Sequence, residues 1–123
     1  EIDPTVTPIP DEDIWYDEFL SAKIVIGVVA STEEAIETIN EYSGGHSAAI
    51  VTANSETADR FLNEVDCAAV YHNASTRFTD GGQLGLGAEI AISTQKLHFR
   101  GPLGAEHLLT NKWFVYGNGQ LRN

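Results

Sequence analysis

Alternation between apolar, β-branched runs and helix-periodic segments constrains the fold of this chain more than any other feature. The run AKIVIGVVA (22–30) is apolar on both faces, and the shorter runs SAAIVT (47–52) and CAAVYHN (67–73) have the same character. Such runs are typical of strands buried on both sides of a parallel sheet. Helical spacing separates each run from the next. The order strand–helix–strand–helix–strand, with short connections, predicts an α/β fold with a parallel, right-handed sheet.

Both expected helices carry boundary signals. The first, STEEAIETINEY (31–42), opens with Ser31 and Glu34 in the spacing of a capping box, and its apolar residues fall on one face. The glycines of SGGH suit the end of that helix. The second helix is expected within NSETADRFLNEV (54–65), where Ala58, Phe61, Leu62 and Val65 repeat the helical spacing.

The part of the chain after Asn73 does not continue this alternation. It begins with NASTRFTDGGQLGLGAE (73–89), whose glycines lack the spacing and the preceding strand of a dinucleotide-binding fingerprint. We therefore expect a loop that turns tightly against a neighbouring element. The later segments predict a short strand or turn (88–95), a short helix entered through Pro102 (101–109) and a strand in NKWFVYGNG (111–119).

The first 14 residues differ in composition from the rest. They hold three of the four prolines and five acidic residues, which predicts an extended arm or linker.

Length, charge and cysteine content narrow the class of protein. The 123 residues fit a single domain, and the net charge of −11 argues against a nucleic-acid partner. The longest apolar run is too short to span a bilayer, so no membrane partner is expected. One cysteine excludes an internal disulfide and suits a reducing compartment, and the first residues do not resemble a signal peptide. A cytoplasmic location is therefore expected.

Few side chains are candidates for chemistry. Cys67 begins an apolar strand with no base nearby in sequence, which favours a buried structural thiol over a nucleophile. The four histidines form no close metal-type pair with another histidine or a cysteine, so no metal is expected. Arg77 is flanked by Ser75, Thr76 and Phe78, which offers a fork for a carboxylate, hydroxyl groups and an apolar wall. On composition alone, a surface arginine without a ligand remains an equal alternative.

A long run in the second half resembles a known enzyme family. The run is VYHNASTRFTDGGQLGLGAEIAISTQKLHFRGPLGAEHLLTNKW, and its most distinctive parts are NASTRFTDGG and GLGAE. It is similar to the γ-glutamyl phosphate reductases, or glutamate-5-semialdehyde dehydrogenases, of the aldehyde dehydrogenase superfamily. The same family is also similar to an earlier run, DEFLSAKIVIGVVASTEEAIETINEYSGGHSAAIVT. The resemblance therefore covers about residues 14–122. It implies NADPH-dependent reduction of L-glutamyl 5-phosphate to L-glutamate 5-semialdehyde in proline biosynthesis. The cysteine thioester of that reaction would form upstream of this segment, and Cys67 does not occupy the place of that cysteine.

The resemblance also implies roles for individual residues. Glu18, in DEFL, matches the glutamate that holds the nicotinamide ribose hydroxyls of the cofactor. The NASTRF loop lines the acyl pocket, where Arg77 and its hydroxyl neighbours would hold the α-carboxylate end of glutamyl phosphate and Phe78 would wall its chain. The implied substrate-binding set is Asn73, Ser75, Thr76, Arg77 and Phe78. The segment Lys112–Gly119 resembles the strand that these enzymes add to a neighbouring subunit, which implies a homo-oligomer.

The implied organisation is the C-terminal part of the enzyme. Residues 15–110 would belong to its catalytic domain and 111–123 to an oligomerisation strand and tail, and the chain alone is expected to be inactive. A non-catalytic assembly or binding module that keeps the fold is the alternative. Another acyl-phosphate or aldehyde dehydrogenase is a third possibility, against which the NASTRFTDGG run argues.

Overall fold

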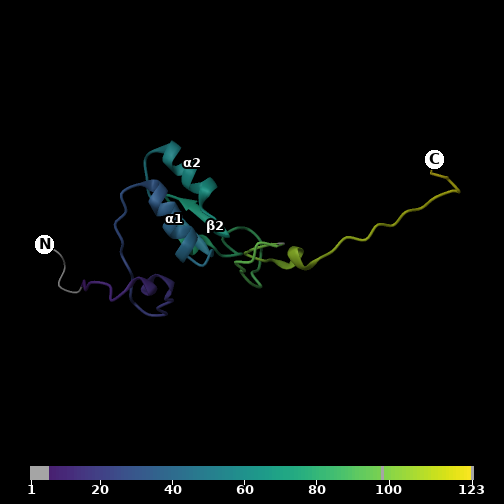
Figure 1. Ribbon diagram of the computed structural model, residues 1–123. Helices are drawn as coiled ribbons and strands as arrows, with labels where there is room; N and C mark the ends of the chain where they lie inside the picture. Colours follow the sequence, from purple (N-terminus) through teal and green to yellow (C-terminus); the bar gives the residue numbers. More distant parts are fainter. Residues whose placement is uncertain (1–5, 98, 123) are drawn as a thin grey trace.

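The computed structural model describes residues 6–97 and 99–122. Two helices, α1 (Thr32–Tyr42) and α2 (Ser55–Glu64), alternate with two strands, β1 (Ser47–Ile50) and β2 (Ala69–His72), at the centre of the molecule (Figure 1). Three short 3-10 helices complete the described elements: η1 (Glu12–Tyr16), η2 (Thr76–Phe78) and η3 (Ala105–Leu108). The α/β class predicted from the sequence is confirmed.

The two strands form a parallel sheet whose register runs from Ser47 beside Ala69 to Ile50 beside His72. Parallel pairing brings the carboxyl ends of both strands to one edge. The core lies between this sheet and the helices, and its buried members are Ile36, Ala48, Phe61, Val65 and Cys67. Ile36 of α1 and Phe61 of α2 come from the apolar faces that the helical spacing predicted.

Side-chain caps set the first residue of each α-helix. Ser31 Oγ accepts a hydrogen bond from the backbone N–H of Glu34 at 3.2 Å. The Glu34 carboxylate accepts from the N–H of Ala30 rather than that of Ser31, so only one half of the predicted capping box has its standard partner. Asn54 Oδ1 caps α2 by accepting from the N–H of Thr57 at 2.9 Å. Both helices therefore begin where the sequence predicted.

The strand predicted over residues 22–30 is not formed. Ile24, Ile26 and Val28 are 81, 72 and 97% exposed, and none of these residues joins the sheet. Their apolar pattern describes a strand buried on two faces, but a strand also requires a hydrogen-bonded neighbour, and β1 and β2 pair only with each other. The segment instead follows the N-terminal part of the chain, where a Cβ on Gly27 would lie 2.8 Å from Cη2 of Trp15.

The strand predicted over residues 111–119 is also absent from the described structure. The final segment projects from the body (Figure 1), and Trp113 and Tyr116 are 85% and 93% exposed. The predicted short helix after Pro102 is present as η3, which starts three residues later, at Ala105. Within the expected strand or turn over 88–95, Ala91 forms a single antiparallel bridge with Leu103.

The arm predicted over residues 1–14 lies partly outside the described residues, which begin at residue 6. Residues 6–11 contain no helix or strand, and η1 begins at Glu12. Tyr16 stacks edge-on against Tyr42 with ring centroids 4.8 Å apart, which ties this region to the end of α1.

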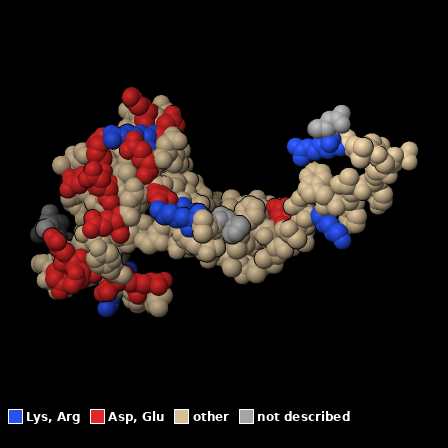
Figure 2. Space-filling model, turned by 45° about the vertical axis from the view of Figure 1, so that its right-hand side comes forward, with Lys and Arg blue, Asp and Glu red and all other residues tan. Residues whose placement is uncertain are grey.

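The charged groups are unevenly distributed over the surface. Acidic side chains crowd the helical body in the face shown in Figure 2, whereas the projecting C-terminal segment carries few of them. None of the helices in the described part of the chain has the length and apolar character needed to cross a bilayer.

Candidate functional site

The carboxyl ends of β1 and β2 border an open pocket of about 840 Å³. Its walls are Val51, Thr52, Ala53, Asn73, Ala74 and Ser75. In parallel α/β sheets, ligands bind beyond the carboxyl ends of the strands. Of these walls, the one that follows β2 was predicted from the sequence, whereas the one that follows β1 was not. The signal was available, because two parallel strands must end at the same edge.

Asn73 joins the two walls. Its Oδ1 accepts from the backbone N–H of Thr52 at 3.0 Å, and its Nδ2 donates to the carbonyl of Thr52 at 2.9 Å. His72 Nε2 lies 2.9 Å from the same carbonyl, and since a carbonyl only accepts, that nitrogen carries a proton. Asn73 has φ of 53°, a left-handed conformation that asparagine tolerates better than most residues. The turn sends the chain away from the sheet towards η2.

The turn η2 is tied down at both ends. Ser75 Oγ accepts from the N–H of Arg77 at 3.2 Å, which caps the start of the turn. Just after its end, Thr79 Oγ1 lies 2.9 Å from Tyr71 Oη, and Tyr71 belongs to β2. The residues of η2 therefore occupy a fixed place beside the pocket although they lie on a surface loop.

Arg77 is an exposed cation beside this pocket. Together with Phe78, Asp80 and Gln83 it lines a second, smaller hollow of about 270 Å³. The Asp80 carboxylate accepts from the N–H of Gln83 at 3.0 Å. Among residues 6–97 and 99–122, Arg77 forms no ion pair, so its guanidinium is free to bind an anion from solution.

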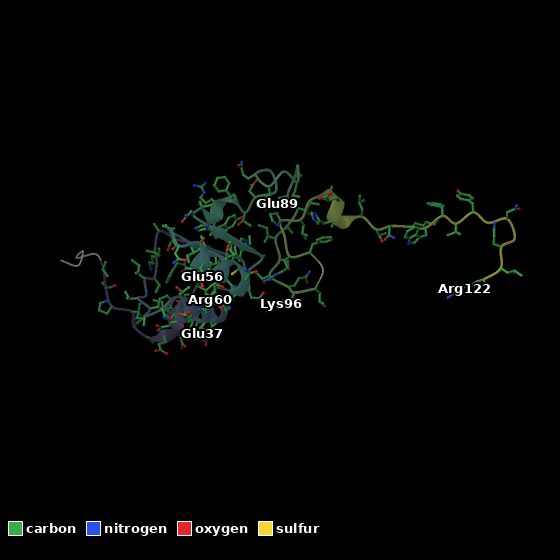
Figure 3. The ribbon with its side chains drawn as sticks, turned by 90° about the horizontal axis from the view of Figure 1, so that it is seen from above. Glu37, Glu56, Arg60, Glu89, Lys96 and Arg122 are labelled. Carbon is green, nitrogen blue, oxygen red and sulfur yellow. The ribbon has the colours of Figure 1, made fainter. Side chains whose placement is uncertain are left out.

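In the described part of the chain, three other basic side chains form ion pairs, namely Arg60, Lys96 and Arg100. Arg60 pairs with Glu33 and Glu64 on the two helices. Figure 3 places Arg60 with Glu37 and Glu56, on the helical side of the molecule.

The glycine-rich segment turns tightly, as predicted, but the residues that it meets belong to its own later part. Gly81 is buried, and its N–H donates to Glu89 Oε2 at 2.9 Å. A Cβ on Gly81 would lie 2.9 Å from the carbonyl oxygen of Ala88, so a side chain is excluded there. Gly85 and Gly87 have φ of 79° and 76°, which favours glycine. This loop closes on its own backbone and does not form a phosphate cradle.

Polar contacts also fix the amino edge of the sheet. Arg100 Nη1 lies 2.9 Å from Asp66 Oδ1, and Nη2 donates to the carbonyls of Asp66 and Gly45. Lys96 pairs with the second oxygen of Asp66. The hydrogen bond from Lys96 and then that from Arg100 hold the pKa of the Asp66 carboxyl below its ordinary value. These contacts tie Lys96 and Arg100 to the segment that precedes β2.

Cys67 lies at this same amino edge. Its side chain is 8% exposed, and its Sγ is 3.5 Å from Ser43 Oγ. Five residues, four of them in β2, lie between it and Asn73, which allows a separation of up to about 20 Å at roughly 3.3 Å per residue. The thiol is therefore remote from the pocket, which agrees with the structural role predicted for it.

Glu18 is not brought to the pocket within this chain. It lies in exposed coil after η1, and Figure 1 shows that region well apart from the loop after β2. Its carboxylate makes no hydrogen bond to another described residue, so it could accept ribose hydroxyls. Its neighbours Asp11, Glu12, Asp13 and Asp17 would repel a pyrophosphate. The described residues consequently do not form a dinucleotide site by themselves. They also contain no group of three or more potential metal ligands.

Comparison with known proteins identifies the family to which this chain belongs. The family model described as "Aldehyde dehydrogenase family" matches residues 2–88, and the chain belongs to that family. Its relatives include proteins named gamma-glutamyl phosphate reductase. The one from Gloeobacter violaceus is 59% identical over 120 residues, which cover 98% of this chain and 28% of that protein. The one from Bacillus mycoides is 54% identical over 121 residues, with 98% and 29% covered.

A solved structure agrees with these relatives. The crystal structure of gamma-glutamyl phosphate reductase from Thermotoga maritima superimposes with a TM-score of 0.90 at 53% identity, over 98% of this chain and 29% of that one. The chain thus spans less than a third of the length of the proteins that it matches.

Proposed function

We propose that this chain supplies the substrate-carboxylate pocket of a γ-glutamyl phosphate reductase. The enzyme would convert L-glutamyl 5-phosphate to L-glutamate 5-semialdehyde in proline biosynthesis, with NADPH as reductant and a cysteine thioester formed on a segment upstream. The observation that carries the proposal is the free Arg77 guanidinium, held on a turn tied at both ends beside the pocket. The names of the relatives support the choice of reaction.

The proposed roles follow from the chemistry of each group. The Arg77 fork would bind the α-carboxylate with two charge-assisted hydrogen bonds. Ser75 Oγ accepts from the backbone of the turn, but its own proton remains free to donate to the ligand. Thr76 would add a second hydroxyl. Phe78, which is 49% exposed, would cover the methylene chain. No residue of this chain is assigned to the covalent step.

Other parts of the chain would serve the cofactor and the assembly. Glu18 would accept hydrogen bonds from the ribose hydroxyls of NADPH once other segments complete the nucleotide site. Residues 1–14 would be an arm, 15–110 part of the catalytic domain, and 111–123 an oligomerisation strand and tail. The segment Lys112–Gly119 would pair with a neighbouring subunit of a cytoplasmic homo-oligomer, because its aromatic residues are exposed on both faces and lack a partner strand.

A segment exchange tests the proposed function. These 123 residues would replace the matching segment of the Thermotoga maritima enzyme, and the product is hereafter called the grafted reductase. Phosphate-dependent oxidation of glutamate 5-semialdehyde would be followed through NADPH formation. We expect activity within about tenfold of the parent enzyme. A parallel graft of the Bacillus mycoides segment, whose identity to this chain is 54%, is the matched control.

The alternative function is a non-catalytic assembly or binding module. The exposed aromatic residues of the C-terminal segment favour it, since they indicate an assembly surface that does not depend on catalysis. A grafted reductase that assembles normally but is inactive, while the control graft is active, would contradict the reductase proposal and favour this module.

A further inference from the structure

The side chain of Asn73 is committed to the backbone of the opposite pocket wall. Its amide oxygen accepts from the N–H of Thr52, and its amide nitrogen donates to the carbonyl of Thr52. The side-chain amide thus takes the place of a backbone peptide group that would pair with Thr52 if β2 continued. The N–H of Asn73 also donates to the carbonyl of Ile50 at 2.8 Å. The pairing of β1 with β2 therefore continues one step past the last paired residues, although the chain at Asn73 has already turned away from the sheet.

This bond network reaches the start of α2 and both ends of η2. Thr52 Oγ1 accepts from the N–H of Asn54, which is itself the cap of α2. On the other side, η2 begins three residues after Asn73, and its far end is fixed by the contact between Thr79 and Tyr71. The position of Arg77 is thus set by Asn73 before the turn and by Tyr71 after it.

We propose that Asn73 is a positioning residue that acts through Arg77, and that it does not bind the substrate itself. The inference rests on the proposed function, because it takes Arg77 as the anchor of the substrate carboxylate. It changes the role expected for Asn73, whose amide is already used within the protein. The Tyr71–Thr79 contact is the second half of the same device and holds the far end of the turn.

Asn73→Gly is the informative substitution. Glycine keeps the left-handed backbone without strain and removes both bonds to Thr52. In the grafted reductase we expect the KM for glutamate 5-semialdehyde to rise on the order of tenfold, as two lost hydrogen bonds would allow. Asn63→Ala is the control, since Asn63 makes one local bond to the carbonyl of Asp59 on an exposed helix face. It should leave the KM unchanged.

A double-substitution cycle separates positioning from direct binding. If Asn73 acts through Arg77, then Asn73→Gly should add nothing to the KM of Arg77→Ala. Multiplied effects in the double variant would show that Asn73 binds the substrate independently and would overturn the inference. An unchanged KM in Asn73→Gly, with a raised KM in Arg77→Ala, would also overturn it while leaving the proposed function intact. An unchanged KM in Arg77→Ala would contradict both the inference about Asn73 and the proposed function.

Tyr71→Phe tests the same positioning role at the other end of the turn. It can be used even if Asn73→Gly does not fold. It removes one hydroxyl and keeps the ring packed on β2. We expect Tyr71→Phe alone to raise the KM for glutamate 5-semialdehyde. In the Arg77→Ala background it should cause no further rise. A Tyr71→Phe effect that multiplies with that of Arg77→Ala would contradict the positioning role.

Discussion

Cys67→Ser distinguishes a structural thiol from a catalytic one. The side chain is 8% exposed at the amino edge of the sheet, and the pocket lies at the other end of β2, up to about 20 Å away on extended-chain spacing. Its neighbour within reach is Ser43 Oγ, which is neither a base nor a cation. Lys96 and Arg100 contact the adjacent residue, but both are paired with the Asp66 carboxylate and neither is bonded to the Cys67 thiol, so they are not arranged to generate a reactive thiolate. We therefore expect kcat/KM of the grafted reductase to stay within about twofold of the unchanged protein.

If Cys67 were the catalytic nucleophile, its substitution would lower kcat by orders of magnitude. Removal of a covalent nucleophile costs roughly 10⁶ in kcat, so steady-state kinetics on Cys67→Ser cannot confuse the two cases. A modest loss of stability, about 1 kcal/mol, is expected because a hydroxyl is less well accommodated than a thiol in the core. Thermal denaturation measures that loss separately from activity. A Cys67→Ser variant that folds normally but has lost all activity would refute the structural assignment.

Groups outside the pocket give three further expected outcomes. Glu18→Gln in the grafted reductase should raise the KM for NADP⁺ and spare that for the aldehyde, and equal losses would indicate misfolding instead of a lost ribose contact. Lys96 and Arg100 lower the pKa of the Asp66 carboxyl in the folded chain. The stability that this carboxylate contributes is therefore present above its unfolded pKa of about 3.9, and it is lost as pH falls through the lower pKa of the folded state. The Tm difference between the unchanged chain and Asp66→Asn should therefore shrink below about pH 4, and a pH-independent difference would contradict this. Deletion of residues 112–123 should give monomers or insoluble protein in light scattering, whereas a soluble monomer of the intact chain at micromolar concentration would count against strand exchange.

The sequence predicted those elements whose partners lie nearby in the chain. Ser31 and Asn54 cap helices through residues three positions later. Ile36 and Phe61, from the apolar faces of the two helices, share one core with Ala48 of β1. The segment 22–30 has the composition of a buried strand but forms none, because a strand also depends on a neighbour that periodicity does not reveal. The same reason applies to 111–119.

The site was predicted in part for similar physical reasons. Arg77 and its neighbours stood out as a local cluster of complementary groups, and they lie together on η2. Thr52 was missed because its backbone makes contacts across the sheet edge, which follow from the register of β1 on β2 and not from the composition of either strand. Tyr71 was missed because its hydroxyl contacts Thr79 in the loop after β2, and the path of that loop is not apparent from the sequence.

The most direct test of the account asks whether Arg77 recognises the α-carboxylate. The grafted reductase and its Arg77→Ala variant would be compared on glutamate 5-semialdehyde and on 4-aminobutanal, which is the same molecule without that carboxylate. Loss of a charge-assisted contact of about 1.5–3 kcal/mol should lower kcat/KM for the semialdehyde by roughly tenfold to more than a hundredfold. The value for 4-aminobutanal should be nearly unchanged. Equal reductions for both aldehydes, or none for either, would contradict the assignment of Arg77 to the substrate carboxylate.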